Sequence, residues 1–300
     1  MRNKKGRAEP DSARELRSPL ALVATTFPTD PMIECIDDSI EYDECGEGAT
    51  IVLAPGSCST GAAWRPMVSQ WRGGFRCITT SLLGYGRTAE RRTEEDAGIA
   101  LEAEVLETVI RRAACPVHLV GHSFGGLVGL AVALRQQVPL QSLTVLEAPA
   151  PTVLPALGEL GPYGEIRAMT DAYFAAFRRG EAEAIRRMID FFGGAGTFDA
   201  WPQRVRDYAT ETTAVNIRDW ATAYAFDLAP AVLATIEIPT LVVWGGLSHP
   251  AVRRANQLLG QCLPRASAVT LAGAAHFMIA THAEEVAGLV ARHVTGRGRS

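Results

Sequence analysis

A serine between two glycines is the first feature of this sequence that could do chemistry. Gly121, Ser123 and Gly125 form the pattern Gly-x-Ser-x-Gly. A serine hydroxyl acts as a nucleophile when a neighbouring base takes its proton. Apolar residues 117–120 precede the pattern, and residues 127–134 follow it with the spacing of a helix. A strand that turns sharply into a helix would hold Ser123 at the tip of the turn, so we predict a nucleophilic serine there.

Such a serine needs a basic partner, and histidine is the usual one near neutral pH. His276 is the candidate because it follows the last predicted strand, residues 267–271. The carboxyl ends of parallel strands meet at one edge of a sheet, which would bring His276 near Ser123. The other five histidines lie within a strand, beside the serine, in a loop or near the last helix: His118, His122, His249, His282 and His293. Among these, only His249 keeps an alternative role, because its loop is expected near the same edge.

The composition is typical of an ordinary globular protein. The chain has 300 residues, is 47% hydrophobic and has a formal net charge of −4. We expect no nucleic-acid binding because there is no basic stripe, and no membrane span because no apolar run reaches about 18 residues. Six scattered cysteines without metal spacing indicate reduced thiols in a cytoplasmic protein. We expect a small-molecule substrate, no metal and no cofactor.

Strand and helix patterns alternate along most of the chain. Strands are predicted where residues alternate or form short apolar runs, at 33–36, 40–42, 50–54, 77–80, 117–120, 143–147, 239–244 and 267–271. Helices are predicted from apolar periodicity at 94–112, 127–134, 251–259 and 283–294. This alternation is typical of a parallel sheet wrapped by helices. The first seventeen residues have no apolar core, and residues 1–30 are expected to form a poorly ordered extension.

One block of the sequence breaks this alternation. Residues 150–235 are rich in arginine, glutamate and aromatic residues and contain no strand-like run. We predict that they form a helical cap inserted between the sixth and seventh strands. The remaining segments, 31–149 and 236–297, would then form one α/β core. Most of the aromatic side chains are expected to pack inside the cap, and a minority to line a pocket.

Taken together, these motifs resemble the α/β-hydrolase fold family over residues 32–295. Three features occur in the family's order: a glycine turn at Pro55-Gly56-Ser57, the Gly-x-Ser-x-Gly turn, and the late His276. The resemblance implies a mostly parallel eight-stranded sheet wrapped by helices, with a helical cap between strands six and seven. It also implies that Ser123 is the nucleophile and that His276 is its base.

The same resemblance assigns an oxyanion hole to two backbone N–H groups. Such preorganised donors stabilise the negative charge that develops on the substrate oxygen. Phe124 would supply one N–H and Ser57 the other. Many family members have His-Gly where this chain has Pro55 and Gly56, but the donor is a backbone group, so the hole need not be lost. The alternative is that this segment is only a tight turn; Cys58 beside it could line the pocket or be a small buried residue.

The acid of the catalytic triad is the point at which the chain departs from the family pattern. The family usually places an aspartate in the loop after the strand that follows the cap, where this chain has Ser248. No aspartate or glutamate occurs between Glu237 and Glu284. Glu147, at the end of the strand after the Ser123 helix, matches the position used by a subset of the family. By this resemblance and by elimination we assign Glu147 as the acid; the alternatives are that it organises loop backbone, or that no acid exists.

These residues predict a serine hydrolase that acts on a small ester or related acyl substrate through an acyl-enzyme and a Ser-His-Glu triad. An acyltransferase, a perhydrolase and an amide or carbon–carbon bond hydrolase would use the same groups. A second class is a non-catalytic binding or interaction protein that lacks a working acid. Dehalogenases and epoxide hydrolases of the family are disfavoured because they use an aspartate nucleophile. A dinucleotide-binding protein is disfavoured because the glycine spacing does not fit G-x-G-x-x-G.

Overall fold

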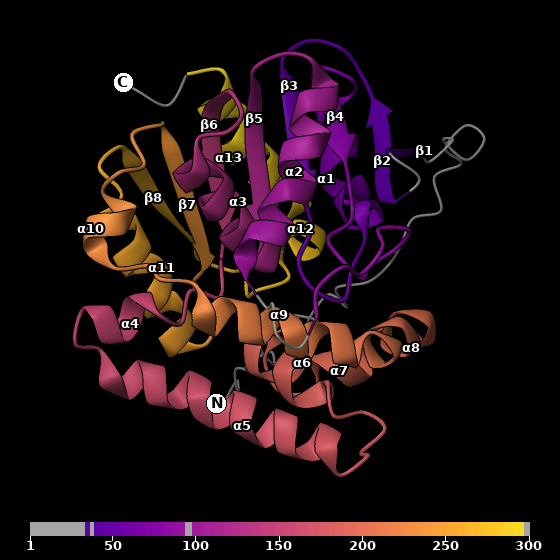
Figure 1. The fold of residues 1–300 in the computed structure, drawn as a ribbon, viewed down its shortest axis with the longest axis vertical. Helices are drawn as coiled ribbons and strands as arrows, with labels where there is room; N and C mark the ends of the chain where they lie inside the picture. Colours follow the sequence, from indigo (N-terminus) through magenta and orange to yellow (C-terminus); the bar gives the residue numbers. More distant parts are fainter. Residues whose placement is uncertain (1–33, 37–38, 94–97, 297–300) are drawn as a thin grey trace, which may run out of the picture.

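The protein is built around a twisted central sheet (Figure 1). The computed structural model describes residues 34–36, 39–93 and 98–296, so the expected extension at 1–30 lies outside the described residues. The strands are β1 (Glu34–Ile36), β2 (Ile40–Cys45), β3 (Thr50–Ala54), β4 (Arg76–Thr79), β5 (Val117–His122), β6 (Leu140–Leu146), β7 (Thr240–Gly245) and β8 (Ala266–Leu271). Their order across the sheet is β1-β2-β4-β3-β5-β6-β7-β8.

The predicted mostly parallel eight-stranded sheet needs one correction, because the sheet is mixed. Strands β3 to β8 run parallel, whereas β2 pairs with β4 in the antiparallel direction. Seven strands, β2 to β8, form the continuous sheet, and the three-residue β1 pairs only with β2. The physical reason is the short connection 46–49 between β2 and β3, which reverses the chain so that β2 runs opposite to β3 and β4, whereas parallel strands need a long crossover.

Each face of the sheet is covered by helices, which explains the continuous apolar run of β3. Successive residues of a strand point to opposite faces: Val52 and Ala54 belong to one core, and Ile51 and Leu53 belong to the other. The first core is covered by α2 (Ile99–Ala113), α3 (Phe124–Arg135) and α11 (Pro250–Cys262). The second is covered by the short turns η1 (Gly61–Trp64), α1 (Arg65–Val68) and η2 (Ser69–Trp71), and by α12 (Met278–Thr281) and α13 (Ala283–Val294). Figure 1 shows α2 and α3 in front of the sheet and α13 behind it.

Between β6 and β7 the chain forms helices only, and every residue of this segment is described. They are α4 (Val153–Ala156), α5 (Leu160–Arg178), α6 (Arg186–Gly193), α7 (Thr197–Ala200), α8 (Gln203–Glu211), α9 (Thr213–Ala225) and α10 (Pro230–Leu233). Helices α4 to α9 gather below the sheet in Figure 1, and α5 runs along the outer margin. Within the described ranges, no helix has both the length and the apolar character needed to cross a bilayer.

Candidate active site

Ser123 lies at a strained turn between β5 and α3. Its backbone has φ 53° and ψ −126°, a conformation that non-glycine residues rarely adopt. A Cβ atom on Gly121 would lie 2.2 Å from the carbonyl oxygen of Gly125, and a Cβ atom on Gly125 would lie 2.3 Å from that of Ala54. Strand, turn and neighbouring strand therefore approach so closely that only glycine fits at these two positions.

The three residues predicted to form a triad are brought together by side-chain hydrogen bonds. The His276 Nε2 atom lies 2.9 Å from Ser123 Oγ, and its Nδ1 atom lies 2.9 Å from Glu147 Oε1. Only 4% of His276 is exposed, and Glu147 is fully buried. An imidazole in this position can take a proton from the hydroxyl while the carboxylate stabilises the resulting positive charge.

The Glu147 carboxylate is held by two further donors. Its Oε2 atom accepts hydrogen bonds from the backbone N–H of Gly245 and from Ser248 Oγ, each at 2.7 Å. Ser248 occupies the position at which the resemblance predicts an aspartate, and it is buried. Its contact with Glu147 was not predicted from the sequence, although a polar residue at that position was the available signal. Glu147 itself has φ 51°, so backbone strain of the left-handed region occurs here as well as at Ser123.

His122 also contributes to this arrangement, although its ring does not contact the serine hydroxyl. Its Nε2 atom lies 2.8 Å from the carbonyl oxygen of His276. Burial, together with the nearby His276 ring, lowers the pKa of His122 to about 3, so the ring is neutral near neutral pH. A neutral ring with its proton on Nε2 donates to that carbonyl and anchors the His276 loop. Adjacency in the sequence places His122 beside the serine, but no local pattern predicts this contact with the His276 carbonyl oxygen.

His118 and His249 are engaged away from Ser123. The His118 Nδ1 atom lies 2.8 Å from Ser142 Oγ, between two strands. His249 begins α11, and its ring stacks on Phe191 with 3.9 Å between the ring centroids. The structure therefore places His249 near the helices between β6 and β7 but shows no contact with Ser123 in the described part of the chain.

The predicted oxyanion loop packs directly against Ser123. A Cβ atom added to Gly56 would lie 2.8 Å from Ser123 Cβ. In the described part of the chain, the backbone N–H groups of Ser57 and Phe124 make no hydrogen bond to another protein group. Phe124 also begins α3, where the helix dipole is positive. Two unpaired donors beside Ser123 can therefore stabilise a negative charge that develops there.

Cys58, the next residue of this loop, does not have the properties of a second nucleophile. Burial, reinforced by the Asp219 carboxylate, raises the pKa of the Cys58 thiol to about 12. Only 7% of the residue is exposed. Because the thiolate is the reactive form, this cysteine stays inert and acts as a small buried residue.

Aromatic side chains from the helices between β6 and β7 lie over the candidate site. The Phe192 ring, on α6, is centred 4.6 Å from the His276 ring. The Trp220 ring, on α9, is centred 5.9 Å from that of Phe192. The Phe277 ring, next in the sequence to His276, is centred 5.2 Å from the His276 ring. These rings give the site an apolar surround next to its polar groups.

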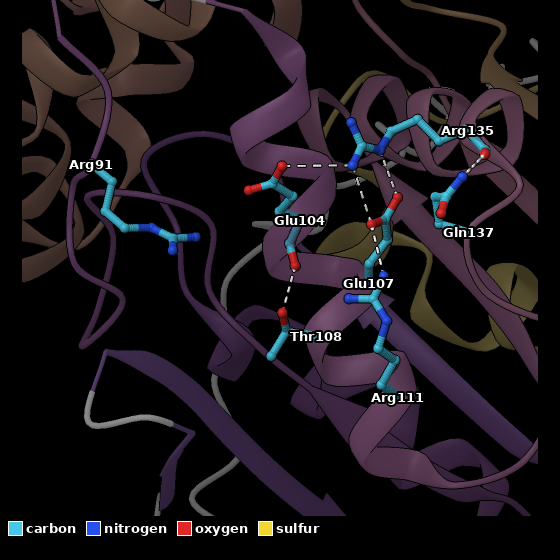
Figure 2. Close-up of a pocket in the computed structure, with 7 residues that line it drawn as sticks. All are labelled: Arg91, Glu104, Glu107, Thr108, Arg111, Arg135 and Gln137. Carbon is cyan, nitrogen blue, oxygen red and sulfur yellow. Dashed lines mark hydrogen bonds and ion pairs between the residues drawn. The ribbon is translucent and has the colours of Figure 1, made fainter.

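A separate hollow on α2 and α3 is polar and is lined by none of these residues (Figure 2). Most of its charged side chains pair with one another: Arg135 binds Glu107 at 2.7 Å and lies 3.6 Å from Glu104. Arg111 pairs with the same Glu107 at 3.2 Å. The hollow therefore adds no group to the candidate active site.

The chain belongs to the alpha/beta hydrolase family, whose model matches residues 51–289. By this membership it is a hydrolase. Over 257 residues it is 26% identical to a pimeloyl-[acyl-carrier protein] methyl ester esterase of Yersinia pseudotuberculosis, a match that covers 82% of this chain and 93% of the relative. It is also 34% identical over 102 residues to a putative carbamate hydrolase RutD of Agrobacterium fabrum. That match spans only 34% of this chain and 39% of the relative.

Solved structures show the same fold at low sequence identity. MenH from S. aureus has a TM-score of 0.68 and 16% identity, covering 86% of this chain and 98% of that chain. An alpha/beta hydrolase from Sphaerobacter thermophilus has a TM-score of 0.64 and 22% identity, covering 85% of this chain and 95% of that chain. At these identities the comparison concerns the fold alone.

Proposed function

We propose that the protein is a serine hydrolase that cleaves a small ester or related acyl substrate through an acyl-enzyme. In this proposal Ser123 is the nucleophile, His276 the general base and acid, and Glu147 the triad acid. Residues 150–235 act as a cap over the site. The observation that carries the proposal is the unbroken chain of hydrogen bonds from Ser123 Oγ through His276 to Glu147, with both links at 2.9 Å.

In the first half of the reaction, Ser123 Oγ attacks the acyl carbon while its proton passes to His276 Nε2. The N–H groups of Ser57 and Phe124 bind the oxyanion of the tetrahedral intermediate, and Glu147 stabilises the imidazolium. The intermediate then collapses, and the leaving alcohol departs with the proton from His276. In the second half, a water molecule gives a proton to His276 and attacks the acyl-enzyme. This releases the carboxylic acid and restores Ser123.

Two observations support an ester with an apolar acyl group. The names of the relatives include a methyl ester esterase that is similar over most of this chain. The aromatic rings of Phe192 and Phe277 lie within 5.2 Å of the His276 ring, measured between centroids. Apolar groups of a substrate gain free energy when such surfaces exclude water from them.

Labelling with a fluorophosphonate probe tests the proposal directly. An activated serine attacks the phosphorus atom and displaces fluoride, whereas an ordinary serine is inert. We expect one probe per chain, on Ser123, with no labelling of the Ser123→Ala variant. Folded protein that takes up no probe would contradict the proposal and favour a non-catalytic binding protein of the same fold.

A series of p-nitrophenyl esters tests the substrate class. We expect higher kcat/KM for uncharged, apolar acyl groups than for acyl groups that carry a carboxylate at the far end. A preference for the charged series would contradict the assignment of an apolar pocket.

A further inference from the structure

A buried carboxylate on α9 joins the helices between β6 and β7 to the oxyanion loop. Asp219 is 2% exposed. Its Oδ2 atom accepts hydrogen bonds from Ser57 Oγ at 2.5 Å and from Tyr85 OH at 2.6 Å. Its Oδ1 atom accepts one from Arg92 Nη1 at 2.7 Å. One side chain therefore binds three donors from two loops of the core, the one after β3 and the one after β4.

Asp219 faces one buried cation, Arg92, which it shares with two other carboxylates. The Arg92 side chain is completely buried, and its guanidinium also pairs with Glu90 at 2.9 Å and Glu102 at 3.1 Å. Burial raises the pKa of the Glu102 and Asp219 carboxyl groups, because one cation does not fully offset the cost of burying them. The three hydrogen-bond donors around Asp219 lower the cost of burying its charge. Because Arg92 is locked in this way, Asp219 has a fixed position from which to hold Ser57.

The loop that Asp219 holds is one whose geometry needs support. Cys58, next to Ser57, has φ 55°, and such a conformation in a non-glycine residue persists only where surrounding contacts maintain it. The Ser57 backbone N–H is one of the two proposed oxyanion donors. Stabilisation of an oxyanion depends on donors that are in place before the charge develops.

We propose that Asp219 is a positioning residue that orients the oxyanion loop through the Ser57 hydroxyl. The N–H of Ser57 is then correctly aimed only while α9 is seated against the core. The neighbouring Trp220 contacts Phe192, which in turn lies over His276. The position of α9 is thereby linked to both sides of the reacting centre. This inference rests on the proposed serine hydrolase function and adds to it a dependence of catalysis on α9.

The Ser57→Ala variant is the sharpest test because it keeps the backbone donor and removes only the contact with Asp219. We expect kcat for a p-nitrophenyl ester to fall about ten- to a hundredfold with little change in KM, because displaced donors weaken transition-state binding. Affinity for a trifluoromethyl ketone should fall by a similar factor. Ser123 adds to this ketone reversibly, giving a hemiketal whose oxyanion occupies the hole. Ser57→Thr keeps a hydroxyl and should restore much of the activity.

Tyr208→Phe is the matched control. The Tyr208 hydroxyl, on α8, accepts a hydrogen bond from Gly86 N–H at 2.9 Å, so it too joins these helices to the core, but it does not contact Ser57. We expect this variant to keep wild-type kcat and ketone affinity. If Tyr208→Phe lost as much activity as Ser57→Ala, the effect would reflect general loosening of the helices, and the inference would be overturned.

A double variant of Ser57 and Asp219 provides a second test, because it measures whether the two residues act through one contact. If both act through one contact, the double variant Ser57→Ala/Asp219→Ala should be no slower than Asp219→Ala alone, whereas independent losses would multiply. Multiplying losses would contradict the inference, as would a folded Ser57→Ala protein with kcat within twofold of wild type. If Asp219→Ala does not fold, the Ser57 variants and the Tyr208 control decide the question.

The wild-type protein separates the two proposals. If it neither takes up the fluorophosphonate nor hydrolyses esters, the proposed function is wrong and this inference falls with it. If it reacts at Ser123 and the Ser57→Ala variant reacts equally well, only the role of Asp219 is wrong.

Discussion

Replacing Glu147 with glutamine should disable the proposed triad while leaving its shape intact. The two carboxylate oxygens have different partners: Oε1 lies 2.9 Å from His276 Nδ1, and Oε2 accepts from Gly245 N–H and Ser248 Oγ. The backbone N–H of Gly245 can only donate, so the amide oxygen of a glutamine must take the Oε2 position. The amide NH₂ then faces His276 Nδ1, which must accept instead of donate.

This exchange forces the proton of His276 onto Nε2, the atom that should take the proton of Ser123. The base is then in the wrong tautomer, and no carboxylate stabilises the imidazolium. An amide in place of the acid in a serine triad lowers turnover by about 10⁴-fold, with residual catalysis from the oxyanion hole. We therefore expect Glu147→Gln to lower kcat by about 10⁴-fold, or about 5 kcal/mol in the activation barrier.

The assay is steady-state hydrolysis of a p-nitrophenyl ester at saturating substrate, together with the rate of fluorophosphonate labelling. Glu107→Gln is the matched control because Glu107 is also a buried glutamate, 1% exposed, but lies on α2 beside the hollow of Figure 2. We expect the control to keep wild-type kcat. A loss of less than tenfold in folded Glu147→Gln protein, while Ser123→Ala abolishes activity, would refute the assignment of Glu147 as the acid.

Three further predictions concern the support of the site. Ser248→Ala removes one of two hydrogen bonds to Glu147 Oε2. It should raise the barrier by about 1 kcal/mol, or several-fold in kcat, and an unchanged kcat would exclude a supporting role. In the folded protein the pKa of His122 is lowered to about 3, whereas in the unfolded chain it has its ordinary value of about 6.5. Between these two pH values the unfolded state therefore binds more protons than the folded state. The free energy of unfolding should therefore drop by about 2 kcal/mol from pH 7 to pH 5 on this account. When the free energy of unfolding is measured by urea titration at each pH, His122→Gln should lack this part of the drop. An equal drop from pH 7 to pH 5 in both proteins would contradict the argument. Gly125→Ala, whose Cβ would lie 2.3 Å from the Ala54 carbonyl oxygen, should cost about 3 kcal/mol or more in urea denaturation, and a loss below about 1 kcal/mol would show that the turn can relax.

Much of the fold follows from local patterns in the sequence. The continuous apolar run of β3 reflects a strand buried on both faces, and the helical spacing of α13 reflects a helix buried on one face. Such patterns can be recognised in the sequence without knowing which elements pack against them. The antiparallel direction of β2 within the sheet was not included in the predicted fold class. Direction and register depend on which strand lies beside which, and β2 pairs with β4 rather than with the next strand in sequence.

Part of the candidate site could likewise be predicted from the sequence, and part of it could not. Gly121 and Gly125 restrict the turn locally, so the position of Ser123 was readable from spacing. Glu147 was inferred from its resemblance to the position used by a subset of the family, and because the segment between Glu237 and Glu284 contains no aspartate or glutamate. The contact of Ser248 with that acid is instead a matter of ångström-scale side-chain placement.

The sequence by itself determined the order of strands and helices, the turn that holds Ser123, and the small set of residues able to serve as base and acid. Only the tertiary structure decided that His276 lies between residues 153 and 129 positions away in the chain. It also decided that Asp219 reaches Ser57 across 162 positions. The physical reason is that hydrogen bonds need partners within about 3 Å. Such distances between remote segments are set by the packing of the whole sheet and its helices, which no local pattern records.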